Sequence, residues 1–171
     1  PIEGKQPRLV NQWVPYAGGA FPGHEGHFFG VNCLANELAV HAVKPDGSTF
    51  RSTVLPAAIT TEDVWFRPVH ATTGPDGALY VADFYDARIT HVDPRDNWDR
   101  DHGRIYRLRH REGKSHPHLN LKEATIPALV AYLEHPNQWH RWTARRLLVE
   151  RQDPSALSNL KETLTLERLW T

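Results

Sequence analysis

The sequence predicts a mainly β chain with an α-helical C-terminal part. Short apolar runs separated by Pro-Asp-Gly turns extend to Arg111, and a polar, turn-rich stretch follows them. Beyond that stretch the spacing of apolar residues changes from every second residue to the 3.6-residue period of a helix. We therefore expect a β part at residues 1–111, a linker at 112–122 and helices at 123–171.

The clearest set of strands lies between residues 69 and 108. A Gly-Pro-Asp-Gly turn separates the runs Val69–Thr73 and Ala78–Ala82, as expected for two antiparallel strands. Two more apolar runs follow, Ile89–Val92 and Arg104–Leu108. Four consecutive short strands of this kind make one blade of a β-propeller.

An earlier segment repeats this plan. Gly26–Asn32 and Glu37–Val43 read as two strands, and a Pro-Asp-Gly turn leads into a third at Thr49–Ala57. Matching landmarks in the two segments lie about fifty residues apart, in the range of long propeller blades. Because a propeller needs about four to eight blades to close, the sequence predicts two blades of a larger ring.

The helical part begins with a clear capping signal. Thr125 precedes a helix in which Ile126, Leu129, Val130 and Leu133 share one face, with a proline in the first turn. A second helix is predicted over Gln138–Arg151, and Asp153-Pro154 begins a third, in which Leu157, Leu160 and Leu164 share a face. Short helices joined by Pro-containing turns are typical of HEAT repeats, so we expect HEAT-like helices here.

Composition disfavours several classes of partner. The 171 residues include 20 Lys+Arg and 20 Asp+Glu, so no overall field attracts nucleic acid. No apolar run reaches the length of about twenty residues that a membrane span needs. The single Cys33 permits no disulfide within the chain, and we expect it to be a buried, inert thiol. The basic residues of the second helix are expected to form a solvated face with Glu150 nearby; they are Arg141, Arg145, Arg146 and Arg151.

Four motifs carry a resemblance to a known family. They are Val-Trp-Phe-Arg-Pro-Val at 64–69, Gly-Pro-Asp-Gly-Ala-Leu-Tyr-Val-Ala-Asp-Phe-Tyr at 74–85, Asp-Pro-Arg-Asp-Asn-Trp-Asp-Arg at 93–100, and Gly-Arg-Ile-Tyr at 103–106. With these motifs, the segment from about Trp13 to His110 resembles the C-terminal part of the propeller in PQQ-dependent sugar dehydrogenases. It resembles more closely the large membrane-bound dehydrogenase proteins of Planctomycetes and Verrucomicrobia.

The resemblance implies a sugar- or alcohol-oxidising, quinoprotein-type enzyme in the periplasm or cell envelope. In that group HEAT-like helices follow the propeller, and a c-type cytochrome domain often follows them. Haem c would then belong to a domain outside this chain and accept electrons there. The partners implied are a sugar or other small-molecule substrate and this cytochrome domain.

The same resemblance implies PQQ as cofactor. The family holds the PQQ carboxylates with an Arg-x-Arg-Asp-Val element and with a lysine in a Ser-Leu-Lys turn. Here the first element is Trp65–Val69, which retains only Arg67, and the second is Cys33–Glu37, which has no lysine. The resemblance implies that Arg67 contacts the cofactor; the alternative is that Arg67 pairs with Glu62 or Asp63. The general base is expected on earlier blades, outside this chain.

Two other residue groups suggest metal binding. His24 and His27 lie three apart around a glycine, a pattern that fits a polar loop better than the zinc-protease helix. Several aspartates near the second predicted blade allow a calcium site as a weaker alternative to pairing with neighbouring arginines. The four named for this site are Asp83, Asp86, Asp93 and Asp96.

Two function classes remain open from the sequence. The first is part of an oxidoreductase in which the propeller positions cofactor and substrate. The second is a non-catalytic propeller and HEAT scaffold that binds carbohydrate or protein. A Cys-x-x-Cys-His motif further along the full reading frame would favour the enzyme.

Overall fold

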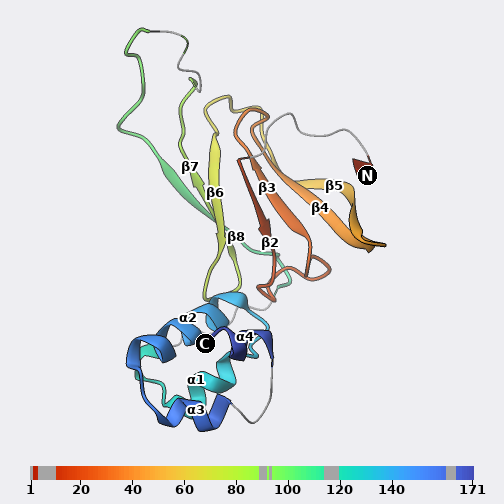
Figure 1. The fold of residues 1–171 in the computed structure, drawn as a ribbon. Helices are drawn as coiled ribbons and strands as arrows, with labels where there is room; N and C mark the ends of the chain where they lie inside the picture. The colour runs from red at the N-terminus through yellow and green to blue at the C-terminus, as the bar shows by residue number, and fades with distance from the viewer. Residues whose placement is uncertain (1, 4–10, 89–91, 93, 114–119, 161–164) are drawn as a thin grey trace. The chain divides into compact units, whose positions relative to one another are not determined.

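A computed structural model describes residues 2–3, 11–88, 92, 94–113, 120–160 and 165–171, and shows a mainly β chain with C-terminal helices (Figure 1). The chain divides into two compact units. The first unit contains the two sheets and is made up of Pro1–Tyr16, Gly23–Thr72 and Leu79–Leu108. The second unit contains the helices and is made up of Ala17–Pro22, Thr73–Ala78 and Arg109–Thr171.

The larger sheet has five strands in the order β1-β5-β4-β3-β2. Neighbouring strands in this sheet are antiparallel, except that β1 runs parallel to β5. The β4–β5 hairpin turns at Gly47, whose φ of +62° lies in the left-handed region that suits glycine. The strands are β1 (Ile2–Glu3), β2 (Gln12–Pro15), β3 (Phe28–Asn32), β4 (Glu37–Asp46) and β5 (Thr49–Thr60).

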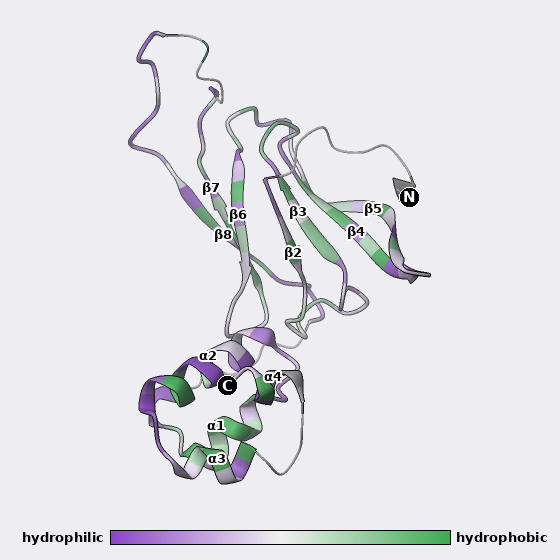
Figure 2. Ribbon diagram, viewed as in Figure 1, coloured by the Kyte–Doolittle hydropathy of each residue, from purple (hydrophilic) through white to green (hydrophobic). Residues whose placement is uncertain are grey.

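The core of this sheet lies at its centre. Phe29 and Val31 of β3 are buried together with Leu38 and Val40 of β4, and Figure 2 shows the hydrophobic stretches along both strands. The strand register aligns Phe29 with Val40 and Val31 with Leu38, so these side chains form cross-strand pairs on the sheet. Burial of paired apolar side chains therefore fixes which strands meet.

The smaller sheet has three strands in the order β6-β7-β8, which are β6 (Pro68–Thr73), β7 (Leu79–Asp83) and β8 (Arg104–Leu108). Leu79 and Val81 of β7 are fully buried. The backbone before β6 is held by Asn36, whose side-chain amide donates to the carbonyl oxygen of Phe66 at 2.6 Å. A side chain from the turn after β3 thus positions the start of the second sheet.

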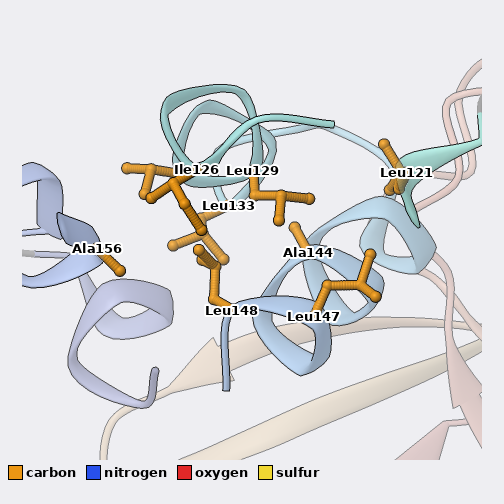
Figure 3. Packing of buried hydrophobic residues seen from close by; sticks show 9 residues of the cluster. Leu121, Ile126, Leu129, Leu133, Ala144, Leu147, Leu148 and Ala156 are labelled. Carbon is orange, nitrogen blue, oxygen red and sulfur yellow. The ribbon is translucent and has the colours of Figure 1, made fainter. Parts of the chain in front are cut away.

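The helices pack on an aliphatic core (Figure 3). They are a 3-10 turn η1 (Leu121–Glu123) and helices α1 (Ile126–Tyr132), α2 (Gln138–Arg151), α3 (Ser155–Leu160) and α4 (Leu166–Leu169). The Thr125 hydroxyl accepts from the amide of Ala128 at the N-terminus of α1, as its sequence position predicts. The buried core residues are Leu121, Ile126, Leu129, Val130, Leu133, Ala144, Leu147, Leu148 and Ala156.

The helical unit also includes the turn at residues 73–78. Asn137 is fully buried and its amide donates to the carbonyl oxygens of Gly74 at 2.9 Å and Pro75 at 3.2 Å. His140 Nε2 lies 2.9 Å from the same Pro75 oxygen. This turn is therefore fixed by buried polar side chains from the start of α2.

Most of the elements expected from the sequence are present. Helix α2 begins and ends at the predicted residues, and the Arg104–Leu108 strand is also as predicted. Strands β4 and β5 run beyond their predicted ends, and β2 was not predicted. Residues 89–91 of the expected Ile89–Val92 strand, as well as Leu164 and Asp93, lie outside the described residues, and Val92 is not in a strand.

Three further sequence expectations can be compared with the structure. Cys33 is buried, as expected. Arg146 pairs with Glu150 at 3.3 Å, whereas Arg141 and Arg151 donate to backbone carbonyls. Within the described ranges, none of the helices combines the length and the apolar character that crossing a bilayer requires.

Candidate functional site

Arg67 lies just before β6, and its guanidinium binds main-chain oxygens. The residue is buried, with 7% of its surface exposed. Its Nε donates to the carbonyl oxygen of Asp86 at 3.0 Å, Nη1 to that of Cys33 at 2.9 Å, and Nη2 to that of Ala87 at 3.0 Å. One side chain thereby connects the end of β3 with the loop after β7.

This arrangement bears on the two roles considered for Arg67. Its guanidinium donates to three carbonyl oxygens, which belong to neither Glu62 nor Asp63. The Cys33–Glu37 turn, where the resemblance would place a cofactor lysine, instead supplies a carbonyl acceptor to Arg67. The described residues therefore do not fit the carboxylates of PQQ, because the one candidate cation is already engaged and buried. That Arg67 contacts an anionic ligand stays a prediction.

The described aspartates among those named for a calcium site accept hydrogen bonds from backbone amides or pair with arginine. Asp83 Oδ1 accepts from the backbone amides of Arg67 at 2.7 Å and Tyr85 at 2.9 Å. Asp86 accepts from the amides of Arg88 at 2.9 Å and Asp99 at 3.0 Å. Asp96 is exposed and pairs with Arg100 at 2.7 Å.

These three aspartates thus organise the backbone or pair with arginine. In the part of the chain that the structure describes, no group of three or more His, Cys, Asp or Glu side chains could hold a metal ion. Asp93, the fourth residue named for calcium, lies outside that part.

An open groove of about 670 Å³ lies beside the end of β7. Phe84 and Trp98 contribute aromatic rings whose centroids are 6.3 Å apart at an interplanar angle of 72°. The guanidinium carbon of Arg88 lies 4.4 Å from the Trp98 ring centroid, so a cation covers one face of the indole. The lining residues are Asp83, Phe84, Trp98, Asp99, Arg100, His102 and Gly103.

A carboxylate and an imidazole form the polar part of this groove. His102 Nδ1 lies 2.8 Å from Asp99 Oδ2. The pKa of Asp99 is lowered, first by the backbone amide of Asp101 and then by the His102 side chain. The carboxylate is therefore ionised at neutral pH, and it favours the tautomer that carries hydrogen on His102 Nδ1. In the neutral imidazole, the Nε2 atom of His102 is then an acceptor.

Asp83 adds a buried acceptor at the groove wall. Only 4% of the residue is exposed, and its Oδ2 has no hydrogen-bond partner among the described residues. The sequence analysis did not select Trp98 or His102 as binding residues, and it considered Asp99 only among the aspartates that allow a calcium site. The available signal was the Asp93–Arg100 motif, which contains Trp98 and Asp99.

The histidines at 24 and 27 meet directly. Their Nδ1 atoms are 3.2 Å apart, and their ring centroids are 5.2 Å apart. Both side chains are partly buried. The expected polar loop is therefore present, and its turn brings two imidazole nitrogens together.

A family model describes most of the β part of this chain. No curated protein and no solved structure matches the chain. Residues 11–112, more than half of the sequence, match the model of a domain of unknown function, DUF7133. That range contains the groove at Trp98, the histidine pair and every strand of the two sheets apart from β1. The chain therefore belongs to the DUF7133 family.

Proposed function

We propose that this chain forms the last blades of a β-propeller and the HEAT-like helices of a sugar- or alcohol-oxidising, quinoprotein-type dehydrogenase. In this proposal, residues of this chain bind the substrate, and residues outside the chain bind the cofactor. The observation that carries the proposal is the groove in which an aromatic pair lies next to an ionised carboxylate and an imidazole. Ligand sites commonly combine aromatic walls with a few polar groups that orient the ligand.

The groove suits a ring with one apolar face and several hydroxyl groups. Arg88 covers one face of Trp98, so a sugar would stack on the opposite face. Asp99 accepts hydrogen bonds from hydroxyl groups, and His102 Nε2 supplies a second acceptor. The unpartnered Oδ2 of Asp83 is a third acceptor at the groove wall.

The remainder of the proposed enzyme rests on the sequence resemblance. PQQ, where bound, would supply the two-electron oxidation. The three carbonyl contacts of Arg67 favour a structural role for this residue over a contact with PQQ. Electrons would pass to a c-type cytochrome domain outside the chain. A periplasmic or cell-envelope location follows from the same resemblance.

A second candidate is a non-catalytic scaffold that binds carbohydrate through the same groove. The engagement of Arg67 with three carbonyl oxygens favours this candidate, as does the absence of lysine from Cys33–Glu37. The two candidates share the groove and differ in redox chemistry. One binding measurement and one oxidation measurement therefore separate them.

The binding experiment titrates the full chain with neutral monosaccharides and disaccharides, and follows tryptophan fluorescence and the indole NMR signals. We expect saturable binding, weakened about tenfold or more by Trp98→Ala because loss of ring contact removes on the order of 1.4 kcal/mol or more. Trp142→Ala is the matched control, since Trp142 lies on α2 with 48% of its surface exposed. Absence of saturable binding, or equal loss in both variants, would contradict the proposed site.

The oxidation experiment uses the full-length parent protein with PQQ and an artificial electron acceptor. Sugar-dependent reduction of the acceptor supports the dehydrogenase. Sugar binding without reduction supports the scaffold instead.

A further inference from the structure

We infer that His24 and His27 form a two-histidine binding site for a borderline divalent metal ion such as Zn²⁺. This site is separate from the Trp98 groove and does not depend on the proposed function. Imidazole nitrogen is a preferred ligand of Zn²⁺ and Cu²⁺. The inference rests on how the two rings are placed and on how the loop holds them.

The distance between the two nitrogens matches that of two ligands on one ion. Zn–N bonds of about 2.0–2.1 Å in a tetrahedral site place two ligand nitrogens about 3.3–3.4 Å apart. The Nδ1 atoms of His24 and His27 are 3.2 Å apart. In the absence of metal, the Nδ1–H group of one ring can donate a hydrogen bond to Nδ1 of the other at this distance. A bound metal ion would replace that hydrogen.

The loop is held in this shape by backbone hydrogen bonds. The amide of His27 donates to the carbonyl oxygen of His24 at 3.0 Å, which closes the turn between the two residues. On the β2 side, the amide of Gly26 donates to the Tyr16 oxygen at 2.9 Å, and the amide of Tyr16 donates to the His27 oxygen at 2.8 Å. Both imidazoles are thus carried by an ordered turn.

Two neighbours restrict the loop further. Gly26 has a φ of +76°, a conformation that other residues rarely adopt. The ring of His24 also lies 5.9 Å from that of buried Phe29, centroid to centroid. A prearranged pair of ligands loses less conformational freedom on binding than two mobile side chains would.

Water would complete the coordination sphere of the ion. Among the residues that the structure describes, no third His, Cys, Asp or Glu side chain joins the pair in a metal-binding group. Such a site keeps open positions, as catalytic zinc sites do with their nonprotein ligand. It would therefore bind metal reversibly rather than as a permanent structural ion.

The test titrates the full chain with ZnCl₂ by calorimetry. We expect one site that His24→Gln and His27→Gln each weaken about tenfold or more, since even lost outer-shell partners cost 10–100-fold in affinity. His70→Gln is the control, because His70 is an exposed histidine on β6 outside this pair. Gly26→Ala keeps both ligands but disfavours the turn, so it should weaken binding while circular dichroism shows an intact fold.

Pulsed EPR of the chain with one equivalent of Cu²⁺ gives an independent readout. Signals from two coordinated imidazoles are expected in the wild type and in His70→Gln, and their loss is expected in His24→Gln and His27→Gln. Equal zinc affinity in the wild type and a His24→Gln, His27→Gln double variant would overturn the inference. Equal weakening by His70→Gln would overturn it as well.

Discussion

Replacement of Arg67 by alanine is expected to destabilise the β unit strongly. The side chain donates to three carbonyl oxygens at 2.9–3.0 Å while 93% of its surface is buried. Hydrogen bonds that involve a charged group contribute about 1.5–3 kcal/mol each, and burial of the guanidinium offsets part of that gain. We therefore expect the free energy of unfolding to fall by about 3–5 kcal/mol, since the truncation also leaves the carbonyls of Cys33, Asp86 and Ala87 without this donor.

The measurement is urea unfolding of the wild type and the variant, followed by circular dichroism and tryptophan fluorescence. In a chain of this size the same loss corresponds to about 6–20 °C in the melting temperature, at about 2–4 °C per kcal/mol. Arg67→Lys should retain part of the stability, because an ammonium group can still donate to one or more of the oxygens. Arg100→Ala is the control, since the Arg100 side chain is 65% exposed and pairs with the exposed side chain of Asp96.

One result would refute this reasoning. If the free energy of unfolding of Arg67→Ala lies within about 1 kcal/mol of the wild-type value, the three hydrogen bonds contribute little net stability. If that stable variant also loses affinity for an anionic ligand, Arg67 has the binding role that the sequence resemblance implies.

Three further outcomes are expected. Asn137→Ala should cost about 2–4 kcal/mol in urea unfolding, because the turn at 73–78 loses two buried hydrogen bonds. Leu129→Ala should cost about 2–5 kcal/mol in thermal unfolding of the helical unit, because Leu129 is fully buried in its core. Burial lowers the pKa of His41, with a smaller opposing effect from Glu37, so the folded state holds His41 neutral where the unfolded chain protonates it. The free energy of unfolding should therefore decrease as pH falls below about 6.5, and His41→Gln should reduce that decrease in urea titrations at pH 5 and 7.5.

Local signals in the sequence were sufficient for the N-termini of α1 and α2 and for the bounds of α2, whereas α4 was not predicted and Leu157 of α3 is exposed. Thr125 and Asn137 both accept hydrogen bonds from backbone amides at helix N-termini, and these caps are visible as residue types at defined positions. The end of α2 is marked by Gln152 in a left-handed conformation with φ of +48°. Capping is decided within a few residues, so the bounds of α2 could be predicted.

The strands were predicted less well at their ends. The hydrophobic pattern stops near Val43 and Ala57, yet β4 continues to Asp46 and β5 to Thr60. Pairing of β4 with β5 continues to Asp46 opposite Thr49 at one end and to Thr60 opposite Glu37 at the other, because backbone hydrogen bonds do not depend on side-chain hydropathy. Strand β2 has only four residues and alternating burial that its sequence does not reveal.

The binding groups could not be predicted because they depend on distant contacts. The acceptors of the Arg67 side chain lie 19, 34 and 20 residues away in the chain. No local pattern reveals that an arginine in a loop will be buried against carbonyl oxygens. In contrast, Asp99 and His102 are only three residues apart, so their pairing could have been considered from the sequence.

The helical unit is not a continuous piece of the sequence, and this determines how it can be isolated. Asn137, Gln138 and His140 all take hydrogen-bond partners from residues 73–75. A fragment expressed from residue 109 onward would carry these three side chains without those partners. Soluble expression of the helices should therefore require a fragment that also includes the 73–78 turn.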